Sequence, residues 1–230
     1  MNKSIYLCLA LAIAACSKQE PPMSATVPTP SEAAGPRASV PADLPAGAYK
    51  IDPSHSSLLF RIDHLGFSKY TGRFKSFDAQ VQLDPANLAA SSVSVNVDPT
   101  SLDVESPPEG FVAELLSANW LDTAQFPTLT YRSTAVEVTG PNTFKITGDL
   151  TLHGVTHPVA LDATLNGGYA SHPMDPQARV GFSARGTFKR SDFGISAGIP
   201  APGTTFGVGD AVEVIVETEL NGPAATTSGS

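Results

Sequence analysis

Cysteine is nearly absent from this chain, which has 230 residues and contains only Cys8 and Cys16. Cys8 lies inside an apolar leader that we expect to be removed, so the mature domain would have neither a disulfide nor a free thiol. A fold without cross-links in an oxidising compartment must be held together by side-chain packing alone.

Charged residues are also few. They make up 16% of the chain, and the formal net charge is −8. No cluster of Lys and Arg interleaves with aromatic residues, which argues against nucleic acid as a partner. Apolar residues make up 41%, which is enough for one sizeable core.

The apolar run near the N-terminus, Ile5–Ile13, is too short to cross a bilayer as a mature helix. It follows the basic Lys3, as the apolar part of a signal peptide follows its basic part. The run ends in Ile13-Ala14-Ala15-Cys16, which resembles a lipobox. We therefore expect residues 1–15 to be a lipoprotein signal peptide and Cys16 to be lipidated. The alternative is an ordinary signal peptide that is cleaved nearby.

The residue after the cysteine bears on location. An Asp there would favour retention in the inner membrane of a Gram-negative envelope, whereas Ser17 is compatible with the outer membrane. Several acyl chains anchor a protein stably, while a single chain binds only marginally. We expect a protein of the bacterial cell envelope, joined to the membrane by its N-terminal lipid and facing the periplasm from the outer membrane.

Three segments follow the leader. Residues 16–46 are rich in Pro and Ala with few large hydrophobic residues, which predicts a flexible tether that cannot offset the entropy cost of folding. Residues 222–230 predict a disordered tail. Residues 47–221 contain no linker-like break and no internal repeat, so they predict one domain.

The domain is dominated by strict alternation of apolar and polar residues, which predicts strands with one buried face. The apolar rows are Leu58, Phe60, Ile62 and His64; Phe77, Ala79, Val81 and Leu83; Val93, Val95 and Val97; Leu129, Tyr131, Ser133 and Ala135; Phe144, Ile146, Gly148, Leu150 and Leu152; Val159, Leu161, Ala163 and Leu165; Val180, Phe182, Ala184, Gly186 and Phe188; and Val212, Val214 and Val216.

About eight such strands must bury their apolar faces against one another, which a closed antiparallel barrel or a sandwich achieves. Several strands run to about ten residues, and this length favours a tall barrel. The inward rows mix large residues with small ones such as Gly148 and Gly186. The small residues either leave room for a ligand along the axis or are filled by phenylalanine side chains from other strands.

One short helix is predicted. Ser106-Pro107-Pro108-Glu109 has the spacing of a capping box with proline at the first helical position. Apolar residues then recur at helical spacing from Phe111 up to Trp120. Such a helix would either pack outside the wall or cover one mouth of the barrel, as a ligand-gating lid or only as a plug.

Several motifs resemble the YceI-like family. They occur in the family's order and together cover residues 48–220. The motifs are Ile51–Ser57 with Phe60 and His64-Leu65-Gly66; Gly72-Arg73-Phe74; Phe126-Pro127-Thr128; Gly148–Thr156; and Arg190–Ile195.

The resemblance implies an all-β fold, an extended eight-stranded antiparallel lipocalin-like barrel, in an exported protein that binds polyisoprenoids, quinone-like lipids or fatty-acyl chains. The stretch Val112-Ala113-Glu114-Leu115 departs from an Asp-x-His-Leu pattern common in the family. If this stretch touches a headgroup, headgroup preference would differ.

We expect the ligand-binding residues to be apolar residues of the inward rows together with a few polar ones. His64 is either an interior histidine or a headgroup contact. Arg190 either contacts Asp192 to fix a turn or faces the headgroup. The predicted set is Phe60, Ile62, His64, Phe74, Trp120, Tyr131, Phe144, Phe182, Phe188 and Arg190.

The sequence gives little support for a catalytic site or a metal site. His153 and His157 flank Gly154 at a strand–turn–strand junction without a third ligand, so we expect no metal site. Asp52, Ser54 and His55 are the residue types of a catalytic triad. On an extended segment, however, neighbouring side chains point to opposite faces and could not form a relay.

The sequence leaves three functions open, none of them enzymatic and none needing a cofactor other than a bound isoprenoid or quinone-like lipid. The first is a lipid carrier, reservoir or sequestering protein. The second is a redox accessory that presents a quinone to a membrane partner. The third is an interaction module with a packed barrel. Homodimerisation is left open.

Overall fold

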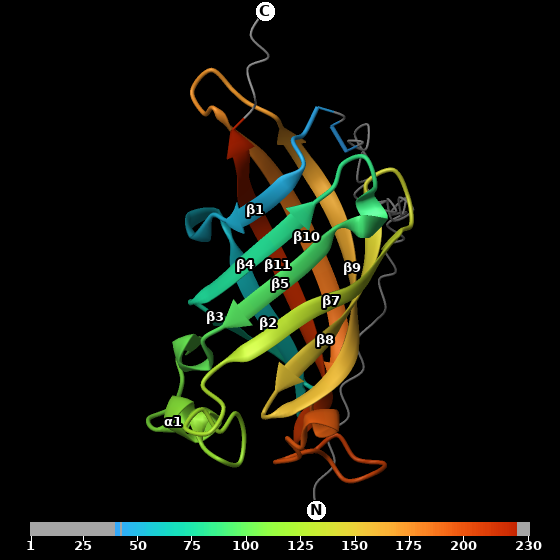
Figure 1. The fold of residues 1–230 in the computed structure, drawn as a ribbon. Coiled ribbons are helices and arrows are strands. Elements are labelled where there is room, and N and C mark those ends of the chain that lie inside the picture. The colour runs from blue at the N-terminus through green and yellow to red at the C-terminus, as the bar shows by residue number, and fades with distance from the viewer. Residues whose placement is uncertain (1–39, 42, 225–230) are drawn as a thin grey trace, which may run out of the picture. The chain divides into compact units, whose positions relative to one another are not determined.

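The computed structural model describes residues 40–41 and 43–224. Most of these residues form β-strands that are joined by turns and loops (Figure 1). The strands are β1 (Gly47–Ile51), β2 (Ser57–His64), β3 (Ser68–Phe74), β4 (Phe77–Leu83), β5 (Ser92–Val97), β6 (Leu102–Val104), β7 (Leu129–Val138), β8 (Thr143–Leu152), β9 (Val155–Tyr169), β10 (Gln177–Lys189) and β11 (Val208–Ala224). Within these residues there is one α-helix, α1 (Phe111–Leu116), and short 3-10 turns at Pro53–His55, Leu88–Ala90, Pro99–Ser101 and Arg190–Phe193.

The sheet closes on itself. Hydrogen-bonded neighbours run β1-β4-β5-β7-β8-β9-β10-β11, and β11 returns to β1 through Lys50↔Asn221 and Ile51↔Leu220. All of these pairings are antiparallel. The prediction of a closed, eight-stranded antiparallel barrel with one short helix is therefore confirmed.

One long strand serves two neighbours along the same edge. β11 pairs with β2 from Val208 to Glu217 and with β1 near Leu220. The turn Pro53–His55 separates β1 from β2, because Pro53 cannot donate a ladder hydrogen bond and Asp52 caps the turn. β2 then pairs with β3, and β3 pairs with β6. These three strands extend the wall at the end of the barrel where β11 pairs with β2.

The predicted inward rows point into the barrel, with one correction in β7. The register shifts between Ser133 and Ala135, as at a β-bulge. Beyond the shift, Ala135 is exposed and Val136 packs against the core. The prediction that Ala135 shares a face with Tyr131 was wrong, because one extra residue reverses the alternation.

The inward glycines Gly148 and Gly186 do not create the open space that they suggest. A Cβ on Gly148 would lie 2.5 Å from Cζ of Tyr131, and one on Gly186 would lie 2.5 Å from Cδ2 of Leu161. The glycines therefore let side chains from adjacent strands lie flat on the wall. Free volume remains elsewhere in the lumen.

The predicted capping box does not form. α1 begins at Phe111 after Gly110, which has a φ of 77°, and no side chain caps it. Ser106 and Pro107 each precede a proline, and a residue before proline is sterically excluded from the helical region. The helix ends at Leu116 rather than near Trp120, and the chain continues in tight turns.

The packed region extends past the predicted domain boundaries at both ends. Leu44 is buried in the core, and the hydroxyl of Tyr49 donates a 2.8 Å hydrogen bond to the carbonyl of Pro45. β11 runs on to Ala224. The predicted signal peptide, Cys16 and most of the tether and tail lie outside the described residues. No helix within the described residues is long and apolar enough to span a membrane.

Replacing Gly148 with Ala should destabilise the barrel by about 1–3 kcal/mol, because the new methyl group would displace Tyr131 from the wall. The matched control is Gly167→Ala in β9, where an added Cβ meets nothing within 4 Å and little change is expected. Urea unfolding of both variants measures the difference. Equal stabilities would show that Tyr131 does not need the glycine.

Candidate functional site

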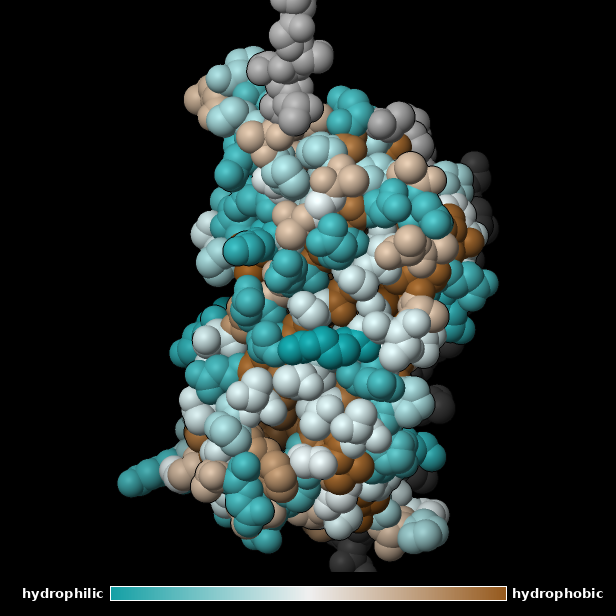
Figure 2. Space-filling view, in the orientation of Figure 1, coloured by the Kyte–Doolittle hydropathy of each residue, from teal (hydrophilic) through white to brown (hydrophobic). Residues whose placement is uncertain are grey.

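A cavity of about 530 Å³ occupies the half of the barrel nearest α1. Its wall comes from strands around the barrel and from the helix. The space-filling view shows hydrophobic residues between the polar side chains over this part of the molecule (Figure 2). The lining residues are Leu58, Leu59, Phe60, Ile62, His64, Tyr70, Phe74, Val95, Val97, Leu102, Pro108, Phe111, Leu115, Trp120, Leu121, Leu129, Thr130, Tyr131, Leu150, Leu152, Val159, Leu161, Phe188, Arg190, Ile195, Val208, Val212, Val214 and Val216.

Polar atoms are scarce in this wall and gather toward one end. His64 is exposed, and its ring lies 6.4 Å from that of Tyr70. Tyr70 in turn meets Phe111 of α1 edge-on at 6.2 Å. These three rings mark the mouth of the cavity, so the interpretation of His64 as an interior histidine was wrong.

A second, smaller cavity of about 120 Å³ lies toward the opposite end of the barrel. It is lined by residues such as Leu83, Phe144, Phe182 and Leu220, and also by Val40, which precedes β1 in the chain. Because Val95, Tyr131, Leu161 and Val216 line both cavities, these four residues form a waist between them.

Tyr131 is the polar member of the waist. Its hydroxyl lies 3.1 Å from the carbonyl oxygen of Ile146 and 3.2 Å from that of Val159, so it donates its one proton to this pair. Burial, with a smaller contribution from Asp149, raises the pKa of Tyr131 to about 12. The phenol therefore stays neutral and remains a donor, which holds its ring against the wall at Gly148.

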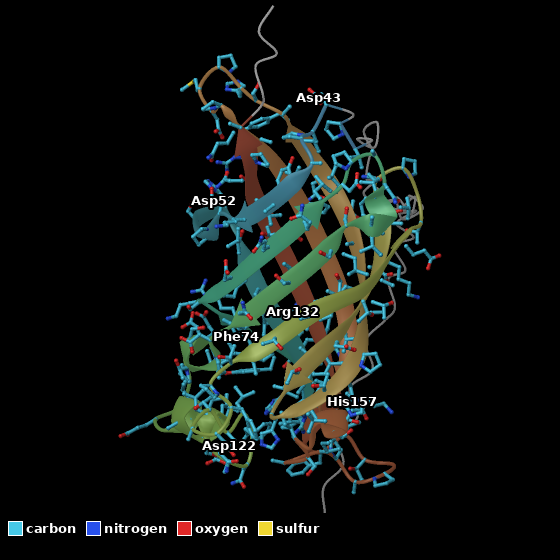
Figure 3. All side chains as sticks on the ribbon, viewed as in Figure 1. Asp43, Asp52, Phe74, Asp122, Arg132 and His157 are labelled. Atoms are coloured by element: carbon cyan, nitrogen blue, oxygen red, sulfur yellow. The ribbon has the colours of Figure 1, made fainter. Side chains whose placement is uncertain are left out.

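The predicted ligand-binding residues separate between the two cavities. Phe144 and Phe182 line the smaller one, where their rings meet at 6.5 Å. The other eight line the larger one, and their contact with a ligand stays a prediction. Figure 3 places Phe74 in the half of the barrel that holds α1, with Asp52 toward the opposite end.

Sequence reasoning missed part of the wall. Tyr70 alternates with Gly72 and Phe74 along β3 and could have been found from that alternation. Phe111 and Leu115 belong to the predicted helix, but nothing in their spacing told which wall they would face. α1 lies at the mouth, as expected, and its action as a lid or a plug stays a prediction.

Arg190 acts through backbone carbonyls. It is only 3% exposed, and its guanidinium donates hydrogen bonds to Gly209 (2.9 Å), Ile195 (3.1 Å) and Val208 (2.8 Å). It also stacks on Trp120, with its Cζ 5.0 Å from the ring centroid. Burial lowers the pKa of Arg190.

The predicted contact between Arg190 and Asp192 was therefore wrong. Asp192 is exposed, and the carboxylate that binds the turn is Asp210, which accepts hydrogen bonds from the backbone and hydroxyl of Ser191. Arg190 fixes the chain that follows β10 and forms part of the cavity wall.

His153 and His157 pack around one phenylalanine. Nδ1 of His153 lies 3.2 Å from the carbonyl oxygen of Phe193, and the ring of His157 meets the Phe193 ring edge-on at 5.4 Å. Both histidines thus hold the turn after β10 against the strands.

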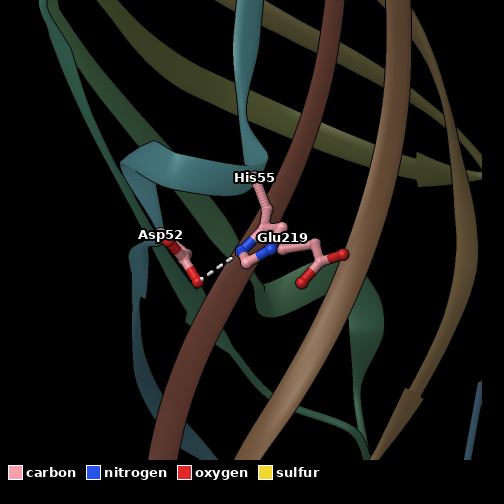
Figure 4. A group of neighbouring side chains, drawn as sticks. All are labelled: Asp52, His55 and Glu219. Carbon is pink, nitrogen blue, oxygen red and sulfur yellow. Dashed lines mark hydrogen bonds and ion pairs between the residues drawn. The ribbon is translucent and has the colours of Figure 1, made fainter.

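Asp52, His55 and Glu219 bring three metal-ligating atoms within 4.8 Å of one another (Figure 4). The group already contains a cation, because Nη1 of Arg179 lies 3.0 Å from Asp52 and 2.7 Å from Glu219. A guanidinium between the two carboxylates leaves little need for a metal ion. The group clamps the bend between β1 and β2 to β10 and β11.

The same residues need a correction to the triad argument. Pro53–His55 is a 3-10 turn and not an extended segment, and it does bring Ser54, His55 and Asp52 together. Both the hydroxyl of Ser54 (3.2 Å) and the carboxylate of Asp52 (2.9 Å) lie at the same nitrogen, Nδ1 of His55. A relay needs the base and the orienting acid on different ring nitrogens, so this geometry is not a catalytic triad.

The sequence is similar to a known protein family and to several of its members. Residues 49–220 match the family model described as the YceI-like domain. A UPF0312 protein of Vibrio cholerae is 40% identical over 159 residues, covering 68% of this chain and 82% of that protein. Protein YceI of Escherichia coli O157:H7 is 43% identical over 152 residues, covering 65% and 77%.

Solved structures share the barrel. BcnA of Burkholderia cenocepacia matches with a TM-score of 0.62 at 25% identity, covering 74% of this chain and 98% of that structure. A polyisoprenoid binding domain from Saccharophagus degradans matches with a TM-score of 0.55 at 13% identity, covering 78% and 100%. At the latter identity the likeness shows the fold alone.

Arg190→Met should cost about 3 kcal/mol of unfolding free energy, because it leaves three carbonyl oxygens without their donor. Asp192→Asn is the matched control and should change stability by less than about 0.5 kcal/mol. Chemical denaturation measures both. A loss at Asp192 as large as that at Arg190 would contradict the carbonyl network as the partner of Arg190.

Asp52→Asn should destabilise the protein at neutral pH but not in acid. Hydrogen bonds from Ser54 and His55, with Arg179 nearby, hold the pKa of Asp52 well below its usual range. A carboxyl with a lowered folded-state pKa contributes stability above its unfolded pKa and loses it as the pH falls. The gap between wild type and variant should therefore narrow progressively as the pH falls below about 4.

Thermal unfolding across a pH series checks this expectation, with Asp78→Asn, an exposed carboxylate on β4, as the control. A gap that persists unchanged into acid would mean that the charge of Asp52 contributes nothing.

Proposed function

The chain belongs to the YceI-like family, and from this premise we propose that it is an exported lipoprotein that holds a long apolar or amphiphilic lipid in its barrel lumen. The lipid would be a polyisoprenoid, a quinone-like lipid or a fatty-acyl chain. The protein would act as its carrier, reservoir or sequestering partner.

The larger cavity carries the proposal. Its volume of about 530 Å³ falls within the range of ligand-binding sites in proteins, and its wall is built almost wholly from aliphatic and aromatic side chains. Each methylene buried in such a wall contributes about 0.8 kcal/mol before ordering costs, so affinity grows with chain length. A packed barrel with a working outer surface would not need this space.

The mouth supports an amphiphile over a pure hydrocarbon. His64 and Tyr70 offer polar atoms where the cavity opens, while the deeper wall offers almost none. The guanidinium of Arg190 is already bonded to three carbonyls. His64 and Tyr70 would therefore contact the headgroup. Arg190 would support the backbone of the cavity wall near them.

The barrel fold is compatible with this ligand class, because a structure from Saccharophagus degradans that shares the fold is described as a polyisoprenoid binding domain. Binding without catalysis agrees with the geometry at Asp52, Ser54 and His55, where one ring nitrogen meets both partners. We propose a binding protein and no enzyme.

Location belongs to the proposal as well. The lipobox-like Ile13-Ala14-Ala15-Cys16 supports a lipid anchor on Cys16, and Ser17 supports the outer membrane with the barrel in the periplasm. Homodimerisation, which the sequence leaves open, would be checked by size-exclusion chromatography with light scattering.

The first test is mass spectrometry of an organic extract of the chain from Ser17 onward, secreted and purified without detergent. A stoichiometric isoprenoid, quinone or acyl species would support the proposal and identify the cargo. A quinone would point to the redox accessory role. A clean protein that also takes up no added isoprenoid would contradict lipid binding.

The second test fills the cavity. Val214→Trp places an indole in the lumen and should reduce uptake of dansylated geranylgeraniol by about tenfold or more. Glu213→Trp introduces the same side chain at the preceding residue, which points outward, and should leave uptake unchanged. Equal uptake by both variants would mean that the ligand binds outside the lumen.

A further inference from the structure

Two phenylalanines protrude into solvent at one end of the barrel. Phe67 lies in the turn between β2 and β3 and is 85% exposed, and Phe206 lies in the segment before β11 and is 84% exposed. Single exposed apolar residues are common, but large exposed ones that lie together on one surface mark a site of contact with another molecule or a membrane.

The two segments lie side by side. The amide of Leu65 donates a 2.8 Å hydrogen bond to the carbonyl of Gly207. A Cβ on Gly66 would lie only 3.1 Å from Cβ of Thr205. Each phenylalanine is next to a residue in this contact, so both belong to one rim. We call the rim formed by residues 65–67 and 196–207 the aromatic rim.

The aromatic rim borders the mouth of the larger cavity. His64, just before the turn, and Val208, just after the second segment, both line that cavity. Ile195, which precedes the second segment, lines it too. A molecule that leaves the cavity past His64 therefore meets the aromatic rim next.

The aromatic rim carries no charge. Residues 196–207 contain no Asp, Glu, Lys or Arg, although the chain as a whole has a net charge of −8. The nearest charges on the β2–β3 hairpin, Lys69 and Asp63, pair with each other at 3.6 Å. The side of the mouth around α1 differs, because Glu105, Glu109 and Glu114 are exposed there.

We propose that the aromatic rim docks on a lipid bilayer surface, with Phe67 and Phe206 inserted among the acyl chains. Docking would place the cavity mouth against the membrane so that a lipid passes between them without crossing water. This inference rests on the proposed lipid-binding function for its purpose.

A lipid surface fits the rim better than a protein partner does. The rim offers two separate protruding rings on short loops, which suits a fluid phase that accommodates them independently. An uncharged rim also avoids repulsion between a net negative protein and anionic lipids, and the acidic side around α1 would stay turned away.

The test uses the chain from Ser17 to Ser230, which lacks only the predicted leader and the cysteine. Vesicles of phosphatidylethanolamine with a minority of phosphatidylglycerol carry dansylated geranylgeraniol. Flotation measures docking, and the rate at which probe fluorescence moves to the protein measures transfer. The same probe dispersed in detergent measures uptake without a membrane.

The combined variant Phe67→Ser and Phe206→Ser should float less and take up the probe from vesicles about tenfold more slowly or worse, because two aromatic rings no longer leave water. Its uptake from detergent should equal that of wild type. Met174→Ser is the matched control, since Met174 is 89% exposed in the turn between β9 and β10 and should affect neither measurement.

Flotation and transfer equal to wild type in the double variant would overturn the proposal and leave the aromatic rim to a protein partner. A wild-type chain that floats through Phe67 and Phe206 but takes up no probe even from detergent would support docking and contradict the lipid-binding function. The two failures are thus distinguishable.

Discussion

The rest of the structure depends on the closure of the sheet through β11. This strand has 17 residues and bonds to β10 on one edge and to both β2 and β1 on the other. Closure pairs the backbone groups that an open sheet would expose, and it forces every inward row to face the others across a shared axis. In a domain without cysteine, this ring of hydrogen bonds and the packing inside it take the place of covalent cross-links. The bend at Pro53–His55 lets one strand edge serve both ends of the barrel.

Most of the fold could be predicted because alternation is a property of each strand alone. Rows such as Phe144 to Leu152 face inward throughout, and no distant contact could reverse them. The predictions failed where residues outside the local sequence pattern, or a steric restriction on the backbone, decided the structure. The bulge after Ser133 reversed one row, consecutive prolines removed a predicted cap, and the buried Arg190 found its partners on Gly209, Ile195 and Val208, which are near it only in the fold. The waist could not be foreseen either, since it depends on which side chain lies flat on which glycine.

That waist explains how one lumen contains two cavities. Gly148 admits the ring of Tyr131 against the wall, and two backbone carbonyls near its hydroxyl hold the ring in place. The mouth and its polar residues therefore belong to the larger cavity, whereas Val40 lines the smaller cavity and Leu44 packs in the core beside it. The larger cavity has its polar groups at the mouth and an apolar wall beyond them, which orients an amphiphile with its headgroup at that mouth.

The end with the smaller cavity is also the end from which the chain extends toward its N-terminus. Val40 and Leu44 pack there, opposite to the mouth. If Cys16 is the anchor, the 24 residues from 16 to 39 can reach at most about 80 Å when fully extended. β11, the longest strand, spans about 56 Å at the usual rise. The extended length of residues 16–39 exceeds the height of the barrel. An anchored molecule could therefore turn its cavity mouth toward its own membrane or away from it, across the compartment.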